Sequence, residues 1–186
     1  MKIQNKASAI ILARSGSKGI INKNLKKIDQ KTLSIKTALQ SNAVNNVFVS
    51  SDSIDYLQLA QSLGAETILR PKKLSSDKAS SEDGILHAIN DIEENNFKIS
   101  DNIIFMQCTS PFTSPKDLDK AFTNFISEEL DSLFSAVKHH GFIWKKDTVT
   151  GINHNEKTLR KRRQEKNEEI LESGAFYIFN KLKFKK

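Results

Sequence analysis

The sequence has few of the residues that stabilise small secreted proteins or bind structural zinc. Cys108 is its only cysteine, which excludes an internal disulfide and disfavours a cysteine-based zinc site. No run of about 18 apolar residues occurs, so we expect no membrane span. The G-x-x-x-x-G-K-[ST] loop of the P-loop nucleotidases is also missing. The 186 residues, 38% of them hydrophobic, suit a single domain over residues 1–186 in a reducing cytoplasm.

Basic residues are concentrated in two parts of the chain. The net charge is +7, and residues 1–30 contain seven Lys and Arg residues but one acidic residue. Residues 157–186 contain ten basic and four acidic residues, whereas residues 31–156 are acidic overall. This distribution favours a small anionic ligand between the two basic parts, and we expect no nucleic-acid partner. The alternative is a solvated basic tail, which we favour for residues 181–186.

The most informative segment is the loop that follows an apolar stretch at residues 8–13. It combines cations with small residues: Arg14, Ser15, Gly16, Ser17, Lys18 and Lys23. Polyphosphate is bound by such groups, because glycine allows close approach of backbone N–H groups and the cations offset the oxygen charges. The alternative interpretation is a solvated basic turn.

Apolar stretches of strand length alternate with segments of helical periodicity. We expect strands at residues 8–13, 47–50, 66–69, 103–106, 132–137 and 175–179. Helices are expected at residues 34–40 and 54–63, from residue 80 or 81, and from residue 114 or 115. In the third helix, Ile85, Leu86 and Ile89 are predicted to form the buried stripe. The alternation predicts right-handed βαβ crossovers and therefore an α/β fold, in which helices cover both faces of a mostly parallel sheet.

Residues 138–170 interrupt this alternation. They are polar and show little hydrophobic periodicity, and a segment that cannot bury a core of its own often packs on a partner subunit. We interpret them as a protruding arm used in homodimerisation and in capping the substrate. Ligands lie at the carboxyl ends of the strands in such folds, so the loops after the predicted strands are where we expect the site.

Five short blocks lie in order in or near those loops. They occupy residues 13–19 with 22–24, 50–53, 70–81, 107–112 and 162–177. Together they closely resemble the signature of the acylneuraminate cytidylyltransferases (CMP–sialic acid synthetases). The resemblance implies a three-layer, Rossmann-like nucleotide-diphospho-sugar transferase architecture. It also implies transfer of CMP from CTP to the anomeric hydroxyl of a sialic-type nonulosonic acid, with release of pyrophosphate and Mg²⁺ as cofactor.

The resemblance also implies roles for individual residues. Arg14 and Lys18 would act in catalysis by offsetting charge on the leaving pyrophosphate. Asn24 would read the cytosine base, and Arg70 would lie near the cytosine carbonyl. The full set implied for CTP is Arg14, Ser15, Gly16, Ser17, Lys18, Lys23, Asn24, Arg70 and Ser81. The set implied for the sugar acid is Gln107, Arg162, Arg163 and Tyr177.

Several of these residues also have structural interpretations. Asn24 can form a turn, Arg70 can be an ordinary surface arginine, and Ser81 can belong to a helix cap. Arg162 and Arg163 can be part of a solvated charge run. These alternatives stay open at the level of the sequence.

No metal ligand is identified in the sequence. Asp52 and Asp77 could bind a metal, but we expect structural roles for both, with Asp52 as a cap or turn residue. Members of the family continue after the last predicted strand into a segment with an Asp-x-Asp-like motif that holds Mg²⁺, whereas this sequence ends at Lys186. We therefore consider a catalytically impaired CTP-binding module as the alternative to an active transferase.

The identity of the sugar stays open. The sequence Gln-Cys-Thr-Ser-Pro at residues 107–111 differs from the Gln-Gly-Asp-Glu-Pro typical of the related KDO synthetases, which favours the sialic-type branch. Thr113 stands where many bacterial sialic acid synthetases have arginine. N-acetylneuraminate, KDN, legionaminate and pseudaminate are all compatible with these residues.

Overall fold

The computed structural model describes residues 5–15, 33–108, 110, 112–155, 157–159, 162–165 and 168–185. The chain divides into two units. The first comprises Met1–Phe134 and Gly174–Lys186, and the second comprises Ser135–Ser173. Each unit is described by itself below.

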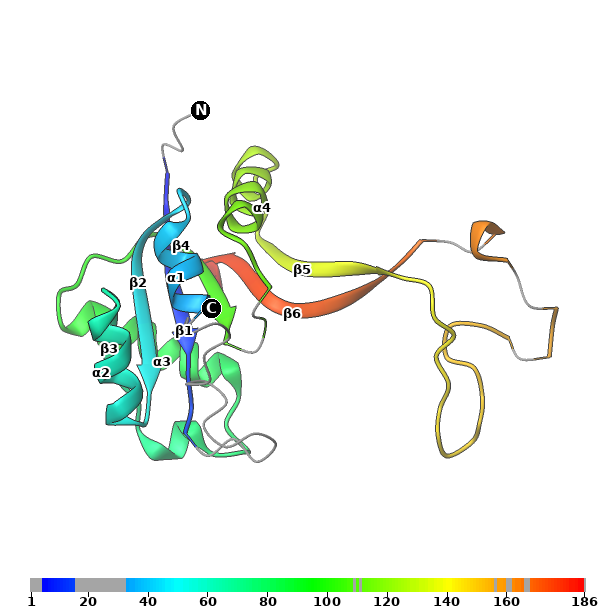
Figure 1. Cartoon of the computed structure of the whole chain (residues 1–186), viewed down its shortest axis with the longest axis horizontal. Coiled ribbons are helices and arrows are strands. Elements are labelled where there is room, and N and C mark those ends of the chain that lie inside the picture. The colour runs from blue at the N-terminus through cyan, green and yellow to red at the C-terminus, as the bar shows by residue number, and fades with distance from the viewer. Residues whose placement is uncertain are drawn as a thin grey trace. The chain divides into compact units, whose positions relative to one another are not determined.

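The described strands form one sheet in the order β3-β2-β1-β4-β6-β5 (Figure 1). They are β1 (Ala7–Leu12), β2 (Val44–Ser51), β3 (Glu66–Leu69), β4 (Asn102–Gln107), β5 (Ser132–His139) and β6 (Glu169–Asn180). β1 pairs in parallel with β2 and with β4, and β2 pairs in parallel with β3. β6 runs antiparallel to β4. The predicted α/β fold is confirmed, and β6 makes the sheet mixed.

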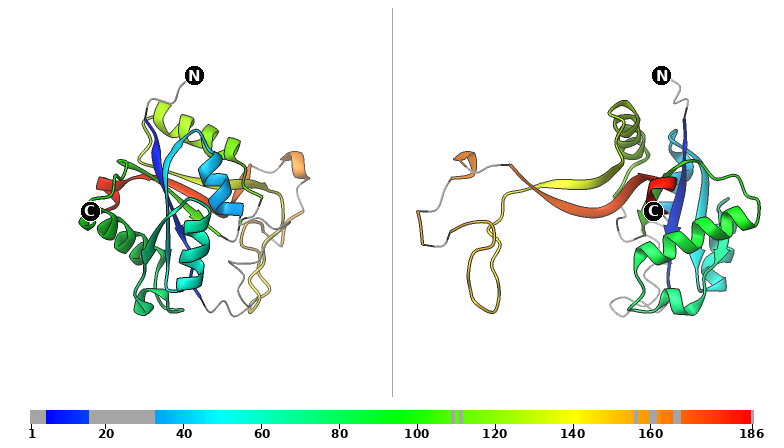
Figure 2. Two further views of the ribbon diagram at one scale, coloured as in Figure 1. Left: turned by 60° about the vertical axis from the view of Figure 1, so that its left-hand side comes forward. Right: turned by 180° about the vertical axis from the view of Figure 1, so that it is seen from behind.

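Helices of the first unit cover both faces of its part of the sheet (Figure 2). One face carries α1 (Leu33–Gln40), α2 (Ile54–Ser62) and α4 (Pro115–Ser127). The other carries α3 (Ser81–Glu94) and the short α5 (Lys181–Phe184). A 3₁₀ turn, η2 (Lys72–Ser75), links β3 to the segment before α3. The three layers predicted from the sequence are therefore present.

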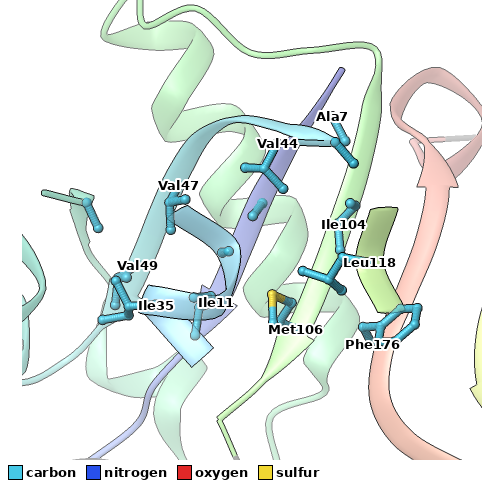
Figure 3. Packing of buried hydrophobic residues seen from close by; sticks show 14 of the residues in the cluster. Ala7, Ile11, Ile35, Val44, Val47, Val49, Ile104, Met106, Leu118 and Phe176 are labelled. Atoms are coloured by element: carbon cyan, nitrogen blue, oxygen red, sulfur yellow. The ribbon is translucent and has the colours of Figure 1, made fainter. Parts of the chain in front are cut away.

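Strand β1 shows why the central strands are apolar at nearly every position. Ala9 and Ile11 pack into the core under α1, α2 and α4. Figure 3 shows Ile11 in this core together with Val47, Val49 and Ile104. Ile10 points to the opposite face and packs in the core under α3. Successive side chains of a strand face opposite sides of the sheet. Because both sides are covered by helices here, the strand does not alternate between apolar and polar residues.

Local capping signals set the start of two helices. Ser80 caps α3, and its hydroxyl accepts a hydrogen bond from the backbone N–H of Asp83 at 3.0 Å. Ser114 and Asp117 form a reciprocal capping box at the start of α4, whose first residue is Pro115. Both starts agree with the sequence prediction, because the cap depends on residues only three positions apart.

Some local predictions are wrong. Leu86 is 39% exposed, and the buried stripe of α3 instead runs through Gly84, Ile85, Ala88, Ile89 and Ile92. A helix turns by about 100° per residue, so Leu86 lies to one side of the stripe that Ile85 and Ile89 share. Strands β2 and β6 begin earlier than predicted, at Val44 and Glu169, because pairing with neighbours extends them through polar residues.

The second unit has its own aromatic contacts. The ring of His154 contacts Phe142 and Trp144 edge-on, with ring centroids 4.8 and 4.6 Å away. Trp144 also forms an isolated antiparallel bridge with Gly151. In the hairpin of β5 and β6, the hydroxyl of Ser173 donates to the carbonyl oxygen of Ser135 at 3.0 Å. Within the described part of the whole chain, no helix is both long and apolar enough to cross a membrane.

A single carboxylate on α4 holds the turn between α1 and β2. Asp119 Oδ1 accepts hydrogen bonds from the Ser41 hydroxyl at 2.6 Å and from the Ala43 backbone N–H at 3.0 Å. Its Oδ2 accepts from the Asn42 side chain at 2.9 Å. Burial raises the pKa of Asp119, but these hydrogen bonds outweigh it and hold the pKa below its ordinary value of 3.8.

Replacing Asp119 with alanine is expected to lower the free energy of unfolding by about 2 kcal/mol, because the buried N–H of Ala43 loses its charged acceptor. The melting temperature should fall by roughly 4–8 °C. Since the folded pKa is depressed, this stabilisation is present above about pH 4 and is lost as the pH falls through the folded pKa. Thermal melts at pH 7 and pH 3 check both statements. Lys120→Ala on an exposed side of α4 is the control, and an equal loss at both pH values would contradict the assignment.

Candidate functional site

A cavity of about 340 Å³ lies at the carboxyl ends of β1 and β4. Its lining comes from these two strand ends, from the segment after β3 and from the start of α3. The lining residues are Leu12, Arg14, Arg70, Leu74, Ser75, Ser76, Asp77, Ala79, Ser80, Ser81, Phe105, Gln107 and Cys108. This is where open α/β sheets bind ligands, and the volume is in the range of small-molecule sites.

Arg70 is a buried cation in the wall of this cavity. It directly follows β3 and is only 4% exposed. Its Nε donates to the Ser75 hydroxyl at 3.0 Å, and its backbone N–H donates to the Ser51 carbonyl at 2.8 Å. Burial lowers the pKa of Arg70, while the charge of Asp52 offsets part of that effect. Arginine still stays ionised at neutral pH, so the site contains a desolvated positive charge and the surface-arginine alternative is excluded.

Gly84 in the first turn of α3 makes room for Arg70. A Cβ atom at position 84 would lie 2.9 Å from Leu12 Cδ1 and 3.0 Å from Arg70 Nη1. Glycine inside a helix costs about 1 kcal/mol relative to alanine. The close approach of Leu12 and Arg70 accounts for its presence, because any side chain here would press on the wall of the cavity.

Arg14 supplies the second positive charge of the cavity lining. Its Nη1 donates to Asp77 Oδ1 at 2.7 Å, and the two side chains are 42% and 47% exposed. An ion pair this exposed contributes little to stability. The ion pair with Asp77 therefore does not require Arg14 for the stability of the fold. The guanidinium has five N–H donors and can also bind an incoming anion.

Ser15 and Asp52 form a close contact beside the cavity. Asp52 Oδ1 accepts from the Ser15 backbone N–H at 2.8 Å, and Oδ2 accepts from the Ser15 hydroxyl at 2.5 Å. Burial raises the pKa of Asp52, but these hydrogen bonds and the charge of Arg70 hold it below the ordinary value. The predicted structural role of Asp52 is confirmed by its bonds to Ser15, but the cap role is wrong, because Ser53 caps α2.

Gln107 ends β4 and places its amide in the lining of the cavity. A Cβ atom on Gly174 of β6 would lie 3.7 Å from its Oε1 and 3.8 Å from its Nε2. Gly174 has a φ of +66°, a conformation that favours glycine. The bend of β6 at Gly174 therefore packs its backbone against the Gln107 side chain.

Two further predicted residues lie in the first unit. Ser81 lines the cavity as the first residue of α3, whereas Ser80 provides the helix cap. Tyr177 is partly buried on β6 and stacks on Phe105, with ring centroids 5.8 Å apart. It supports a residue of the lining and is not itself among the lining residues that the structure describes. The structure thus brings Arg14, Arg70, Ser81 and Gln107 together around one cavity.

The other predicted residues are not among the cavity-lining residues that the structure describes. Arg162 belongs to the second unit, where its backbone N–H donates to Glu165 Oε2 at 3.1 Å. Arg163 is the first residue of a 3₁₀ turn, η3 (Arg163–Glu165), in the same unit. Five residues assigned to CTP lie outside the described part of the chain: Gly16, Ser17, Lys18, Lys23 and Asn24.

Three residues that shape the site were not predicted from the sequence. Ser75 binds Arg70, Phe105 lines the cavity, and Gly84 admits the Arg70 side chain. Ser75 lies inside one of the five blocks, and a glycine in the first turn of a helix is itself a signal of close packing. Phe105 carried no signal beyond its place in an apolar strand.

The described residues do not form a metal site of their own. Asp52 and Asp77 accept hydrogen bonds from Ser15 and Arg14. Within the described ranges there is no group of three or more His, Cys, Asp or Glu residues that could hold a metal ion. The described side chains therefore supply no complete metal site by themselves.

Comparison with known proteins shows which family the chain belongs to. The family model described as "Cytidylyltransferase" matches residues 8–181, a range that includes every strand end around the cavity. The chain belongs to the cytidylyltransferase family. N-acylneuraminate cytidylyltransferase A of Danio rerio is 36% identical over 182 residues, covering 94% of this chain and 41% of that protein. The chain therefore spans well under half the length of this relative.

Two bacterial cytidylyltransferases show similar relations. The N-acylneuraminate cytidylyltransferase of Escherichia coli is 43% identical over 113 residues, which cover 59% of this chain and 26% of that protein. The pseudaminic acid cytidylyltransferase of Campylobacter jejuni (strain 81-176) is 31% identical over 177 residues, covering 91% of this chain and 76% of that protein.

Solved structures confirm the cytidylyltransferase fold. A CMP:2-keto-3-deoxy-manno-octonic acid synthetase in complex with CTP superposes with a TM-score of 0.72 at 19% identity, covering 97% of this chain and 76% of that chain. A 4-diphosphocytidyl-2C-methyl-D-erythritol synthase from Anaerococcus prevotii gives a TM-score of 0.59 at 15% identity, with 96% and 71% coverage. At these identities the likeness concerns the fold alone.

Proposed function

We propose that the protein transfers CMP from CTP to the anomeric hydroxyl of a sialic-type nonulosonic acid and releases pyrophosphate. In this reaction a bond forms between the anomeric oxygen and the α-phosphorus, and the bond from that phosphorus to the pyrophosphate oxygen breaks. One observation carries the proposal. In a member of the cytidylyltransferase family, Arg14, Arg70, Ser81 and Gln107 line one cavity at the carboxyl ends of the strands.

The charges around the cavity suit a nucleoside triphosphate. Arg14 and Arg70 are cations in its lining, against the single described carboxylate of Asp77. We assign Arg14, together with Lys18 and Lys23 of the same loop, to the phosphate groups, where they stabilise the negative charge that develops on the leaving pyrophosphate. Arg70 and Asn24 are assigned to the cytosine, and Ser15, Gly16, Ser17 and Ser81 complete the CTP site.

The sugar acid is assigned to the Gln107 side of the cavity. The Gln107 amide has both donors and acceptors for hydroxyl groups, and it lines the cavity at the carboxyl end of β4. Arg162, Arg163 and Tyr177 complete the proposed sugar site. Relatives of the chain are named for N-acylneuraminate and for pseudaminic acid, which supports a nonulosonic acid without deciding which one.

The cellular setting and assembly are also part of the proposal. We infer Mg²⁺ as cofactor from the family, a cytoplasmic location from the single cysteine, and a homodimer in which residues 138–170 form the arm. Exposed apolar side chains within this segment support a protein contact there: Val149, Ile152 and Ile170 are 68%, 56% and 63% exposed. Sedimentation velocity decides the assembly, and a monomer at all concentrations would contradict the dimer.

The activity is tested with the purified 186-residue protein, CTP, Mg²⁺ and a panel of acids. Pyrophosphate release is expected with at least one of N-acetylneuraminate, KDN, legionaminate and pseudaminate, and not with a hexose 1-phosphate. Replacing CTP by UTP or ATP should abolish it. Equal turnover of UTP or ATP with sugar 1-phosphates would place the protein among other nucleotidyltransferases.

A titration with CTP separates the second candidate function, a CTP-binding module without turnover. Its motivation is the missing ligand set among the described residues. Calorimetry should show CTP binding under either function. Binding without any pyrophosphate release from the full panel would support the module, and release at this chain length would exclude it.

A further inference from the structure

The carboxylate of Asp52 binds both hydrogen-bond donors of Ser15. The backbone N–H and the hydroxyl of Ser15 donate to its two oxygens at 2.8 and 2.5 Å. Ser15 directly follows Arg14, whose side chain lines the cavity. Charge-assisted bonds of this kind are stronger than neutral ones, and a pair of them fixes the backbone and the side chain of one residue together.

These two bonds extend the pairing of β1 and β2 beyond the ends of the strands. The last backbone bond between them runs from the Ala13 N–H to the Ser50 carbonyl at 3.0 Å. In a parallel ladder the next N–H on the same side belongs to the residue two positions later, here Ser15, and its acceptor would be the carbonyl of Asp52. The Asp52 side chain takes the place of that carbonyl, so β1 leaves the sheet at Ser15 while Ser15 itself stays held.

Asp52 also acts on the second cation of the cavity. Its negative charge favours the ionised form of the buried Arg70 and offsets part of the effect of burial on the pKa of that side chain. Asp52 therefore affects both cations of the cavity. It acts on Arg14 through hydrogen bonds to the neighbouring Ser15, and on Arg70 through electrostatic attraction.

We propose that Asp52 is a positioning residue, which fixes Ser15 at the exit of β1 and thereby directs Arg14 into the cavity. The inference rests on the proposed function, because it takes the cavity as the binding site for the phosphate groups of CTP. It also changes the role of Ser15, whose N–H and hydroxyl are directed to Asp52 and not to the nucleotide.

The charge of Asp52 and its positioning role have opposite effects on anion binding. A carboxylate near the cavity repels phosphate, so removing the charge by itself would tighten binding. Removing the group that holds Ser15 releases Arg14 from one orientation, so binding weakens because the orientation must be restored on binding. The direction of the change therefore separates the two effects.

The probe is inorganic pyrophosphate, titrated into the 186-residue protein by isothermal calorimetry and followed by a second titration with CTP. Asp52→Ala is expected to raise the Kd for pyrophosphate about 10-fold or more, equivalent to losing one charge-assisted bond. Asp52→Asn keeps an acceptor oxygen for the Ser15 N–H, so its Kd should rise only about 3-fold. The matched control is Asp55→Ala, which removes an exposed carboxylate from the first turn of α2 and should leave the Kd unchanged.

The amide of Ser15 gives a second measurement that does not depend on activity. Its hydrogen-exchange protection, measured by NMR, should be lost in Asp52→Ala and largely kept in Asp52→Asn. Tighter or unchanged pyrophosphate binding in Asp52→Ala would overturn the inference, as would a Ser15 amide that stays protected. If Asp52→Ala does not fold, an unchanged Kd and unchanged Ser15 exchange in Asp52→Asn would overturn it. Failure of the unmodified protein to bind either pyrophosphate or CTP would instead contradict the proposed function.

Discussion

Arg14→Ala is expected to lower kcat and kcat/KM together by about 10²-fold, because Arg14 stabilises charge that develops on the leaving pyrophosphate. Its ion pair with Asp77 is exposed, so the melting temperature should change by less than about 2 °C. Steady-state kinetics with CTP varied at saturating sugar acid, combined with a thermal melt, measure both effects. Lys18→Ala is expected to behave in the same way if the assignment of this loop is correct.

Two further variants are controls for the kinetic effect of Arg14→Ala. Arg14→Lys keeps the positive charge but loses the planar fork of donors, so it should recover part of the rate. Lys98→Ala removes an exposed positive charge after α3, at the far end of that helix from the cavity, and should leave the kinetics unchanged. A rise in KM for CTP with unchanged kcat would show that Arg14 only binds the substrate.

Arg70→Met is expected to weaken CTP binding by about 10²-fold while the protein stays at least as stable as before. Arg70 is 4% exposed, and its one described side-chain bond is to Ser75. No carboxylate among the described residues lies within ion-pair distance of it. Replacing a buried, weakly compensated charge by an apolar side chain of similar length is often neutral or stabilising. The partly buried Ser75 hydroxyl can turn to water, so its lost partner costs little.

Calorimetry with CTP and thermal melting check the two halves of this expectation. A higher Kd for CTP together with an unchanged or higher melting temperature would show that Arg70 binds the ligand and does not stabilise the fold. A large fall in melting temperature would contradict this, since it would make Arg70 a structural residue. Arg70→Lys is the intermediate variant, because lysine keeps the charge but cannot reproduce the guanidinium bond to Ser75.

Much of the candidate site could be predicted because its residues follow strand ends. Arg14, Arg70 and Gln107 each stand at or just after an apolar stretch, and parallel strands bring their carboxyl ends to one edge of the sheet. The position of these residues in the fold therefore followed from one-dimensional patterns. The state of each side chain did not. Whether Arg70 was buried or exposed depended on its close approach to Gly84 in α3. The glycine signals close packing, but the sequence does not say which residue packs against it.

Asp52 shows the same limit for hydrogen bonds. A short loop of Ser and Asp before a helix predicts a cap, yet Ser53 takes that place and Asp52 bonds to Ser15, 37 positions earlier. Sequence patterns such as helix caps involve residues only a few positions apart. The hydrogen-bond partner of a polar side chain depends instead on which loops the sheet brings together. The contact between Arg14 and Asp77, 63 positions apart, has the same origin.

The alternation of strands and helices, the caps at Ser80 and Ser114, and the resemblance of the five blocks to one family could all be predicted from the amino-acid sequence. Periodicity and capping act over a few residues, and each is written in the chain as a local pattern. The exposure of Leu86, the burial of Arg70 beneath α3 and the hydrogen bonds from Ser15 to Asp52 depend on the folded arrangement of the chain. These features arise when strand order brings distant segments into contact, and no local pattern in the chain specifies them.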